Sequence, residues 1–216
     1  MGVLLLVRHG QASWAADDYD VLSPTGWEQG RALGGAWASR GLRPDAVVRG
    51  GLRRHRETTE ALAASLDVPE SRVDAGWDEF DHVAVLAGMP DPPAGPPTDK
   101  RAYQAVLEQA IDAWMGGGDA YDEPFAAFTA RVGEALRRTP GDGTTVVVTS
   151  GGAIAWVAAS LLADGDATLA ASLWRRLNVV CVNTGVTKVV VGRRGSTLVS
   201  FNDHGHLEGT DLLTYR

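Results

Sequence analysis

The chain contains only one cysteine, Cys181, among its 216 residues. A single cysteine excludes an internal disulfide and fits a reducing compartment. The apolar run Leu4–Val7 is too short for a signal peptide, and no apolar run approaches the length of a membrane span. Basic residues are also in the minority, because 20 Lys and Arg stand against 27 Asp and Glu, for a net charge of −7. We therefore expect a cytoplasmic protein that binds neither a membrane nor nucleic acid.

The sequence also lacks internal repeats and any linker long enough to divide it into independent domains. A chain of this length can bury a substantial core as one domain. Its strand-like and helix-like segments alternate, which predicts an α/β fold: a three-layer sandwich with a mostly parallel central sheet and helices on both faces. The pattern leaves the oligomeric state open.

Hydrophobic periodicity and turn residues predict the individual elements. Strands are expected at 3–7, 45–49, 72–74, 144–149, 178–184, 186–191 and 197–201, and helices at 24–40 (capped by Ser23 and closed by Gly41), from 52, at 103–114, from 123–124 and from 152. The two helices at 103–114 and from 123–124 separate early strands from late ones, after a Pro- and Gly-rich loop at 88–98. We therefore expect a helical cap, inserted at about 80–138, that covers a crevice.

The first strand ends in Arg8, His9 and Gly10. Side chains at the carboxyl end of a buried strand lie where an open α/β sheet binds its ligand. Arginine is suited to phosphate, histidine offers a nucleophilic nitrogen near pH 7, and glycine lets the backbone approach a ligand. An isolated Arg-His pair is equally compatible with a strand that merely ends in charge.

Two further segments carry groups suited to an anion. In the cluster Arg53–Arg56, Arg54 is expected to face the crevice, whereas Arg53 and Arg56 are expected to be solvated. The strand at 144–149 runs into Ser150, Gly151 and a helix, which places backbone N–H groups and a positive helix end at the crevice. Gly-Gly is also common in ordinary turns.

Glu79 lies between Trp77 and Phe80. Apolar surroundings raise the pKa of a carboxyl group and make it a proton donor at neutral pH, whereas nearby arginines act in the opposite direction.

Together these segments resemble the histidine phosphatase superfamily, which has the phosphoglycerate mutase-like fold. The resemblance rests on Arg8-His9-Gly10, the segments 22–29 and 52–58, the acidic position 79, the strand–Gly-Gly–helix at 144–152 and the ending 202–207, and it spans nearly the whole chain. It implies an acid-type histidine phosphatase of the phosphatase branch, acting on a small phosphorylated substrate without metal or other cofactor. His9 would then form a phosphohistidine, with Glu79 as acid and base and with Arg8, Arg54, Ser150 and Gly151 binding the phosphoryl group.

Two positions depart from the family pattern. Ser150 stands where the family usually has a second histidine, and Ala15 where it usually has an asparagine. His82 is one possible replacement, since it lies three residues after Glu79, whereas His204 and His206 are expected to be structural. Losing one preorganised donor typically lowers the rate by a factor of about 10²–10³. A loss of this size slows an enzyme without abolishing its chemistry, so we expect an active enzyme. The alternatives are a catalytically impaired module that binds a phosphorylated ligand and, because the segment after Glu79 does not resemble the mutase segment, less readily a phosphoglycerate mutase.

Overall fold

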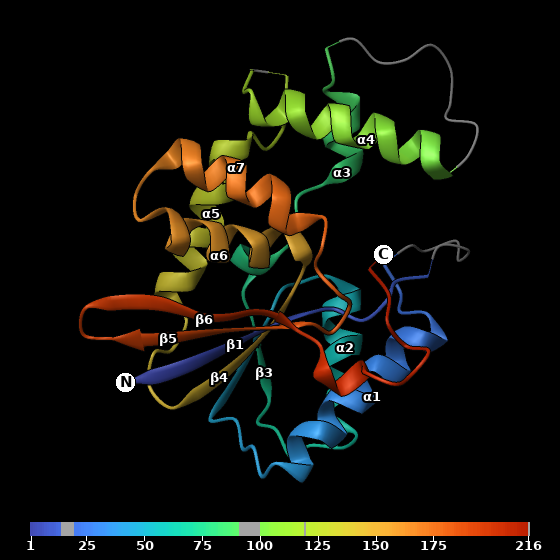
Figure 1. Cartoon of the computed structure of the whole chain (residues 1–216), viewed down its shortest axis with the longest axis vertical. Coiled ribbons are helices and arrows are strands. Elements are labelled where there is room, and N and C mark those ends of the chain that lie inside the picture. The colour runs from blue at the N-terminus through green and yellow to red at the C-terminus, as the bar shows by residue number, and fades with distance from the viewer. Residues whose placement is uncertain (14–19, 91–99, 119, 216) are drawn as a thin grey trace. The chain divides into compact units, whose positions relative to one another are not determined.

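The computed structural model describes residues 1–13, 20–90, 100–118 and 120–215 (Figure 1). The chain forms two compact units, one of Met1–Glu79 with Glu134–Arg216 and the other of Phe80–Gly133. Ala15 and most of the predicted loop at 88–98 lie outside the described residues.

The first unit contains a sheet with the strand order β3-β2-β4-β1-β5-β6. Its strands are β1 (Gly2–Arg8), β2 (Ala46–Arg49), β3 (Ser71–Val73), β4 (Thr144–Thr149), β5 (Val186–Gly192) and β6 (Gly195–Asp203). The strands β1 to β4 are parallel, and β5 pairs antiparallel with both β1 and β6. The predicted mostly parallel sheet is confirmed.

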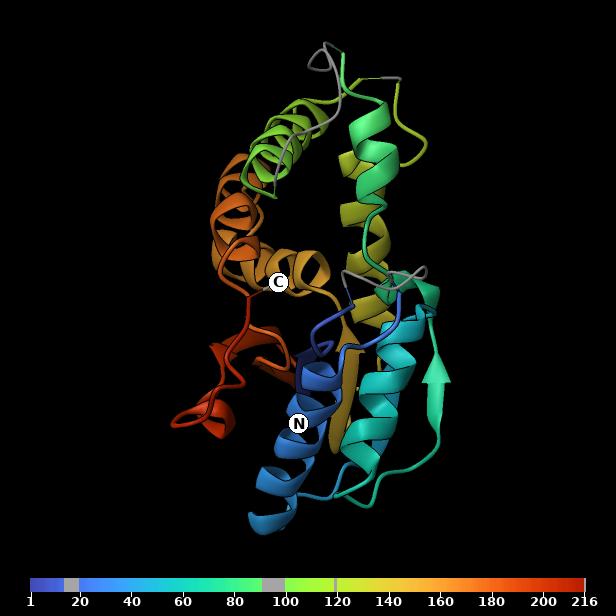
Figure 2. The ribbon, with the colours of Figure 1, turned by 90° about the vertical axis from the view of Figure 1, so that its right-hand side faces the viewer.

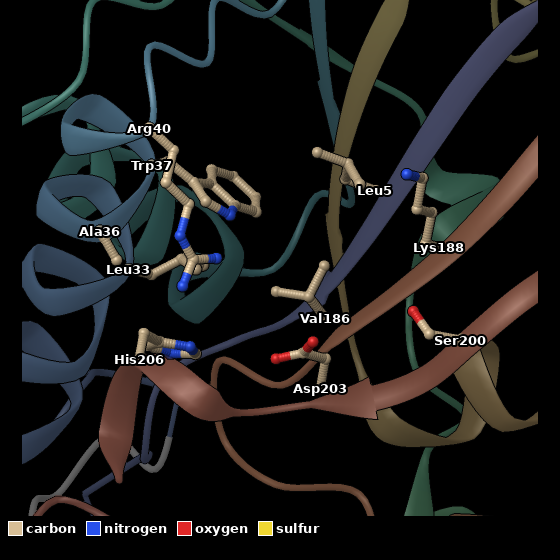
Figure 3. Close-up of a pocket in the computed structure, with 10 residues that line it drawn as sticks. All are labelled: Leu5, Leu33, Ala36, Trp37, Arg40, Val186, Lys188, Ser200, Asp203 and His206. Carbon is tan, nitrogen blue, oxygen red and sulfur yellow. The ribbon is translucent and has the colours of Figure 1, made fainter.

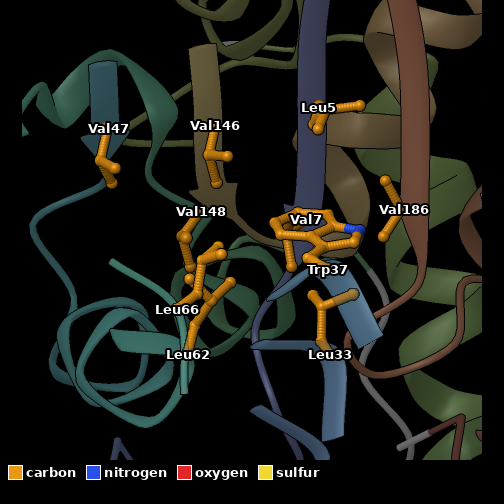
Figure 4. Packing of buried hydrophobic residues seen from close by; sticks show 10 residues of the cluster. All are labelled: Leu5, Val7, Leu33, Trp37, Val47, Leu62, Leu66, Val146, Val148 and Val186. Carbon is orange, nitrogen blue, oxygen red and sulfur yellow. The ribbon is translucent and has the colours of Figure 1, made fainter. Parts of the chain in front are cut away.

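Helices cover both faces of this sheet. They are α1 (Pro24–Ser39), α2 (Arg53–Ala63), α6 (Gly151–Ala163) and α7 (Ala167–Asn178), with the short 3₁₀ helices η1 (Ala75–Trp77) and η2 (Gly205–Leu207). Leu5 and Val7 of β1 pack with Leu33 and Trp37 of α1 and with Leu62 of α2 (Figure 4). Successive strand side chains point to opposite faces, so the intervening Leu4 and Leu6 face the layer of α6 and α7. The three predicted layers are therefore present; α1 and α2 are seen together at one face in Figure 2.

Helix α1 begins and ends where its sequence predicts. The Oγ of Ser23 accepts a hydrogen bond from the N–H of Gly26 at 3.1 Å, and Pro24 occupies the first helical position, where its missing N–H costs nothing. Gly41, just beyond the helix, has a φ of 71°. This left-handed conformation favours glycine and stops the helix.

The strand predicted at 178–184 is wrong. Asn178 ends α7, which the sequence analysis did not predict, and the residues after it form a turn. The N–H of Asn183 bonds the carbonyl of Thr214, and that of Thr184 bonds the carbonyl of Arg8. Thr184 also has a φ of 59°, which an extended strand does not contain. Asn183 and Thr184 therefore bond to other segments of the chain instead of extending the sheet.

The second unit contains α3 (His82–Ala87), α4 (Lys100–Met115) and most of α5 (Phe125–Arg138), which continues into the first unit. The ring of Phe80 lies 4.9 Å from that of Trp114 and 5.6 Å from that of Phe128, measured between centroids. The aromatic residues at 114 and 128 are fully buried and form the core of this unit. Among the described residues, no helix combines the length and the apolar character that a bilayer crossing requires.

Candidate active site

The predicted site residues of the first unit gather at the carboxyl ends of three neighbouring strands. His9 follows β1, Ser150 follows β4, and Gly50 follows β2. The registers place Arg8 opposite Thr149 and Arg49 opposite Val148, so the three strands end at the same edge. Open α/β sheets bind ligands at this edge.

His9 is only 7% exposed, and its Nδ1 lies 2.7 Å from the carbonyl oxygen of Gly10. A carbonyl oxygen only accepts hydrogen bonds, so the neutral ring carries its proton on Nδ1 and leaves the lone pair of Nε2 available. Burial, followed by the charges of Arg54 and Arg8, lowers the pKa of His9 well below its usual value. The ring is therefore neutral at pH 7.

The loop that carries His9 is fixed from two directions. The N–H of Gly10 donates to Thr58 Oγ1 at 3.0 Å, and this hydroxyl donates to the carbonyl of Arg54 at 2.7 Å. On the other side, Asn183 Nδ2 donates to the carbonyl of His9 at 3.1 Å. The sequence analysis assigned no role to Thr58 or Asn183, although Thr58 follows Arg54 by one helical turn.

Gly10 is required for a reason other than the predicted approach of a ligand. A Cβ atom at this position would lie 2.4 Å from the carbonyl oxygen of Gly26, far inside van der Waals contact. The missing side chain makes room for the first turn of α1. It therefore allows close packing between the loop after β1 and this helix.

Two guanidinium groups lie close enough to His9 to lower its pKa. Arg8 donates to the backbone carbonyls of Cys181 and Tyr215, which anchor it to two segments that are distant in the sequence. Arg54 donates from its Nη1 to Asp20 at 2.6 Å, and its buried Nε has no hydrogen-bond partner in the described part of the chain. Arg54 thus retains a donor for a ligand. Arg53 and Arg56 have half-exposed side chains, as predicted.

The start of α6 holds Glu79. The N–H of Gly152 donates to Glu79 Oε2 at 3.0 Å, so the carboxyl group is seated at the positive end of the helix. Gly151 has no side chain between this helix end and Arg8, since a Cβ there would lie 3.5 Å from the arginine Nε. Glu79, Arg8 and Gly151 are therefore brought to one helix terminus.

His55 lies in this site, although the sequence analysis did not select it. Its side chain is fully buried, and its Nε2 lies 2.7 Å from Ser150 Oγ. Its ring centroid is 5.8 Å from that of His9. Burial, together with the charges of Arg54 and Arg49, lowers the pKa of His55 well below its usual value. The sequence does contain a signal for His55. It lies four residues before Thr59, so the two side chains are on the same face of α2.

The other predicted histidines belong to α3 and to the segment around η2. His82 is the first residue of α3 and belongs to the second unit. His206 Nε2 lies 3.0 Å from Thr184 Oγ1, and burial lowers its pKa to about 4. His204 Nδ1 lies 2.7 Å from the carbonyl of Asn202. These contacts give His204 and His206 structural partners.

A separate cavity of about 170 Å³ lies between α1 and the strands β5 and β6 (Figure 3). Its lining includes the apolar side chains of Leu33 and Trp37 and the charged side chains of Arg40, Lys188 and Asp203. Sites for drug-sized ligands usually have about 300–1,000 Å³. None of the residues assigned to phosphate chemistry lines this cavity.

Comparison with known proteins agrees with this geometry. A family model described as histidine phosphatase superfamily (branch 1) matches residues 4–204. No curated protein matches the chain.

Solved structures of similar fold include a phosphoserine phosphatase variant from Entamoeba histolytica in complex with phosphoserine. Its identity is 18% and its TM-score 0.67, over 96% of this chain and 100% of the other. A mycobacterial glucosyl-3-phosphoglycerate phosphatase has 23% identity and a TM-score of 0.62, over 95% and 100%. A putative alpha-ribazole-5'-P phosphatase from Escherichia coli has 17% identity and a TM-score of 0.64, over 94% of this chain and 96% of the other. These three likenesses establish the phosphoglycerate mutase-like fold, and the family match over nearly the whole length shows that the chain belongs to branch 1 of the histidine phosphatase superfamily.

Proposed function

We propose that the chain hydrolyses phosphomonoesters through a phosphohistidine on His9, without a metal ion. The observation that carries this proposal is the state of His9: buried, neutral, with its proton held on Nδ1 and with two arginines beside it. Such a nitrogen can attack phosphorus without first losing a proton. Because its pKa is lowered, it stays nucleophilic below pH 6.5, which supports the acid-type assignment.

In the first step, His9 Nε2 forms a bond to phosphorus while the bond between phosphorus and the ester oxygen breaks. Glu79 gives its proton to the leaving oxygen. In the second step, Glu79 takes a proton from water, the water oxygen attacks phosphorus, and the bond to His9 breaks. Phosphate and the starting form of the enzyme result.

Charge on the transferring group is stabilised by Arg8, Arg54, Ser150 and the N–H of Gly151. Fixed donors of this kind act most strongly where water is excluded. The free Nε of Arg54 supports its part in binding, since a buried donor without a partner costs free energy until a ligand accepts from it.

The substrate class is a small phosphorylated metabolite. Solved relatives of the same fold were crystallised with phosphoserine and with 3-phosphoglyceric acid. We further propose that the unit Phe80–Gly133 acts as a cap, because the chain enters it directly after Glu79. A cytoplasmic location fits Cys181, whose pKa burial raises to about 12, so that the thiol stays protonated.

Turnover of an aryl phosphate by the wild type and by His9→Ala tests the proposal. The wild type should release phosphate, and mixing with substrate followed by an alkaline quench should trap acid-labile phosphate on His9. His9→Ala should show neither. Label on another residue during turnover would overturn the assignment of the nucleophile. Tight phosphate binding without any turnover would favour the alternative, a module that binds phosphorylated ligands.

A further inference from the structure

The buried pair of His55 and Ser150 is unexplained by the fold alone. A histidine that is fully buried on the inner face of α2 gives up its hydration, and its Nδ1 has no hydrogen-bond partner among the described residues. A buried polar atom left in this state costs free energy that an apolar side chain of similar size would not. The position therefore has a use other than core packing.

The surroundings are shaped to hold this imidazole. A Cβ atom on Gly50 would lie 2.3 Å from His55 Nδ1 and 2.5 Å from Asp78 Oδ1, so only glycine at position 50 leaves room for both groups. Asp78 Oδ1 lies 3.8 Å from the same nitrogen. The loop after β2 is therefore fitted to the ring of His55.

Ser150 is likewise held away from its usual task. It is the N-cap residue of α6, yet its hydroxyl forms no capping hydrogen bond. N-cap serines normally accept from an N–H of the first helical turn. Here the hydroxyl meets His55 Nε2 instead, beside the helix end that also holds Glu79.

The direction of the hydrogen bond follows from the ligand. A phosphoryl oxygen only accepts hydrogen bonds, so a serine hydroxyl that binds it must donate its single proton. The serine oxygen is then free to accept from an imidazole N–H. The arrangement thus needs a proton on His55 Nε2, the nitrogen that faces Ser150.

We propose that His55 is a positioning residue that donates from Nε2 to Ser150 Oγ and so aims the serine hydroxyl at the phosphoryl group transferred to His9. The inference rests on the proposed function. It assigns the role of the second histidine, which this chain lacks at position 150, to an imidazole supplied by α2. His55 is thus a further candidate, beside His82, for the residue that compensates for Ser150.

A double-mutant cycle on the full-length protein tests the pairing. Ser150→Ala and His55→Leu should each lower kcat by about ten- to a hundredfold, with KM changed by less than about twofold, because the donor acts mainly on the transition state. The double variant should lose no more than Ser150→Ala alone, since His55 acts only through the serine. If the losses of kcat in the two single variants multiply in the double variant, or if kcat is unchanged in either single variant, the proposal is overturned.

Conservative variants separate positioning from packing. The amide nitrogen of glutamine reaches the place of Nε2, so His55→Gln should retain most of the activity that His55→Leu loses, whereas His55→Asn should not. Leu62→Ala, two turns further along α2, is the matched control: it lowers the melting temperature and leaves kcat unchanged. Similar kcat losses in the Gln, Asn and Leu variants would identify a structural role and refute the inference.

Vanadate binding keeps the two proposals apart. If the wild type shows no turnover and no phosphohistidine, the proposed function fails, and the same cycle is then measured as the affinity for vanadate by calorimetry. If the two single variants lose equal vanadate affinity, and the double variant loses no more than either, the pairing of His55 with Ser150 is still supported. Wild-type affinity in both would overturn it.

Discussion

Replacing Thr58 by valine tests how the catalytic loop is held. Valine keeps the shape of threonine and removes the fully buried hydroxyl that accepts from the N–H of Gly10 and donates to the carbonyl of Arg54. A buried N–H left without a partner costs about 1–3 kcal/mol. The carbonyl lies within α2, where backbone hydrogen bonding continues, so most of the cost falls on the N–H group.

Melting temperature and turnover measure this cost. In a protein of this size, 1 kcal/mol corresponds to about 2–4 °C, so Thr58→Val should melt about 2–12 °C below the wild type. Turnover should fall as well, because the carbonyl of Gly10 holds the proton on His9 Nδ1. Thr58→Ser, which keeps the hydroxyl, should recover most of both properties.

Thr59→Val is the matched control for this prediction. The hydroxyl of Thr59 donates to the carbonyl of His55 within the same helix at 2.9 Å, and it bonds to no other segment among the described residues. Its loss should lower the melting temperature by less than half as much and leave turnover unchanged. If Thr58→Val melts within 1 °C of the wild type at full activity, or if the two valine variants behave alike, the loop is not held in this way.

Three further results are expected. Glu79→Gln should lower turnover of alkyl phosphates by about 10²–10⁴ and that of aryl phosphates far less, because good leaving groups need little protonation. For the wild type, kcat/KM should not fall at pH 6.5 but only well below it, since burial and Arg54 lower the pKa of His9. In the wild type, the unfolded chain protonates His206 below about pH 6.5, whereas the folded chain keeps it neutral to about pH 4. The free energy of unfolding should therefore fall by up to about 3 kcal/mol between these two pH values. His206→Gln should remove this part of the loss of stability in acid.

Each of these results has a contrary outcome. Equal losses on both substrate types would remove Glu79 from the role of acid. An acid limb at pH 6.5 would mean that His9 is not kept neutral by its neighbours. An unchanged acid slope in His206→Gln, measured by denaturant unfolding, would place the acid sensitivity on other groups.

Much of the fold follows from local patterns. The strands with runs of apolar residues, such as Leu4–Val7 in β1 and Val146–Val148 in β4, are recognised because a strand covered on both faces has no polar alternation. The end of α1 is equally local, since Ser23, Pro24 and Gly41 act through their own backbone preferences. The strand predicted at 178–184 was wrong. Its β-branched residues indicate a strand, whereas hydrogen-bond partners that are distant in the sequence decide its conformation.

In the candidate site, too, local patterns were predicted and contacts between distant segments were not. The end of a strand, the charge of an arginine and the Gly-Gly turn are visible in the sequence, and they led to His9, Arg54 and Ser150. The contact between His55 and Ser150 is not visible, because it joins α2 to the end of β4 and depends on the packing of both against the sheet. The packing role of Gly10 is not visible for the same reason: the group that a side chain there would meet belongs to α1.

The pairing of β1 has a consequence for how the chain acquires its structure during synthesis. This strand lies between β4 and β5, with Val3 opposite Thr144 on one side and Val190 on the other. Ribosomes deliver the chain from its amino end, so the most apolar strand emerges long before either neighbour exists. Contacts of such high sequence separation form slowly, and an unpaired apolar strand is prone to aggregation. Yield in a cell should therefore depend on chaperones that shield the nascent β1 segment, and Arg8 can reach its contact at Tyr215 only after all the residues between them have been synthesised.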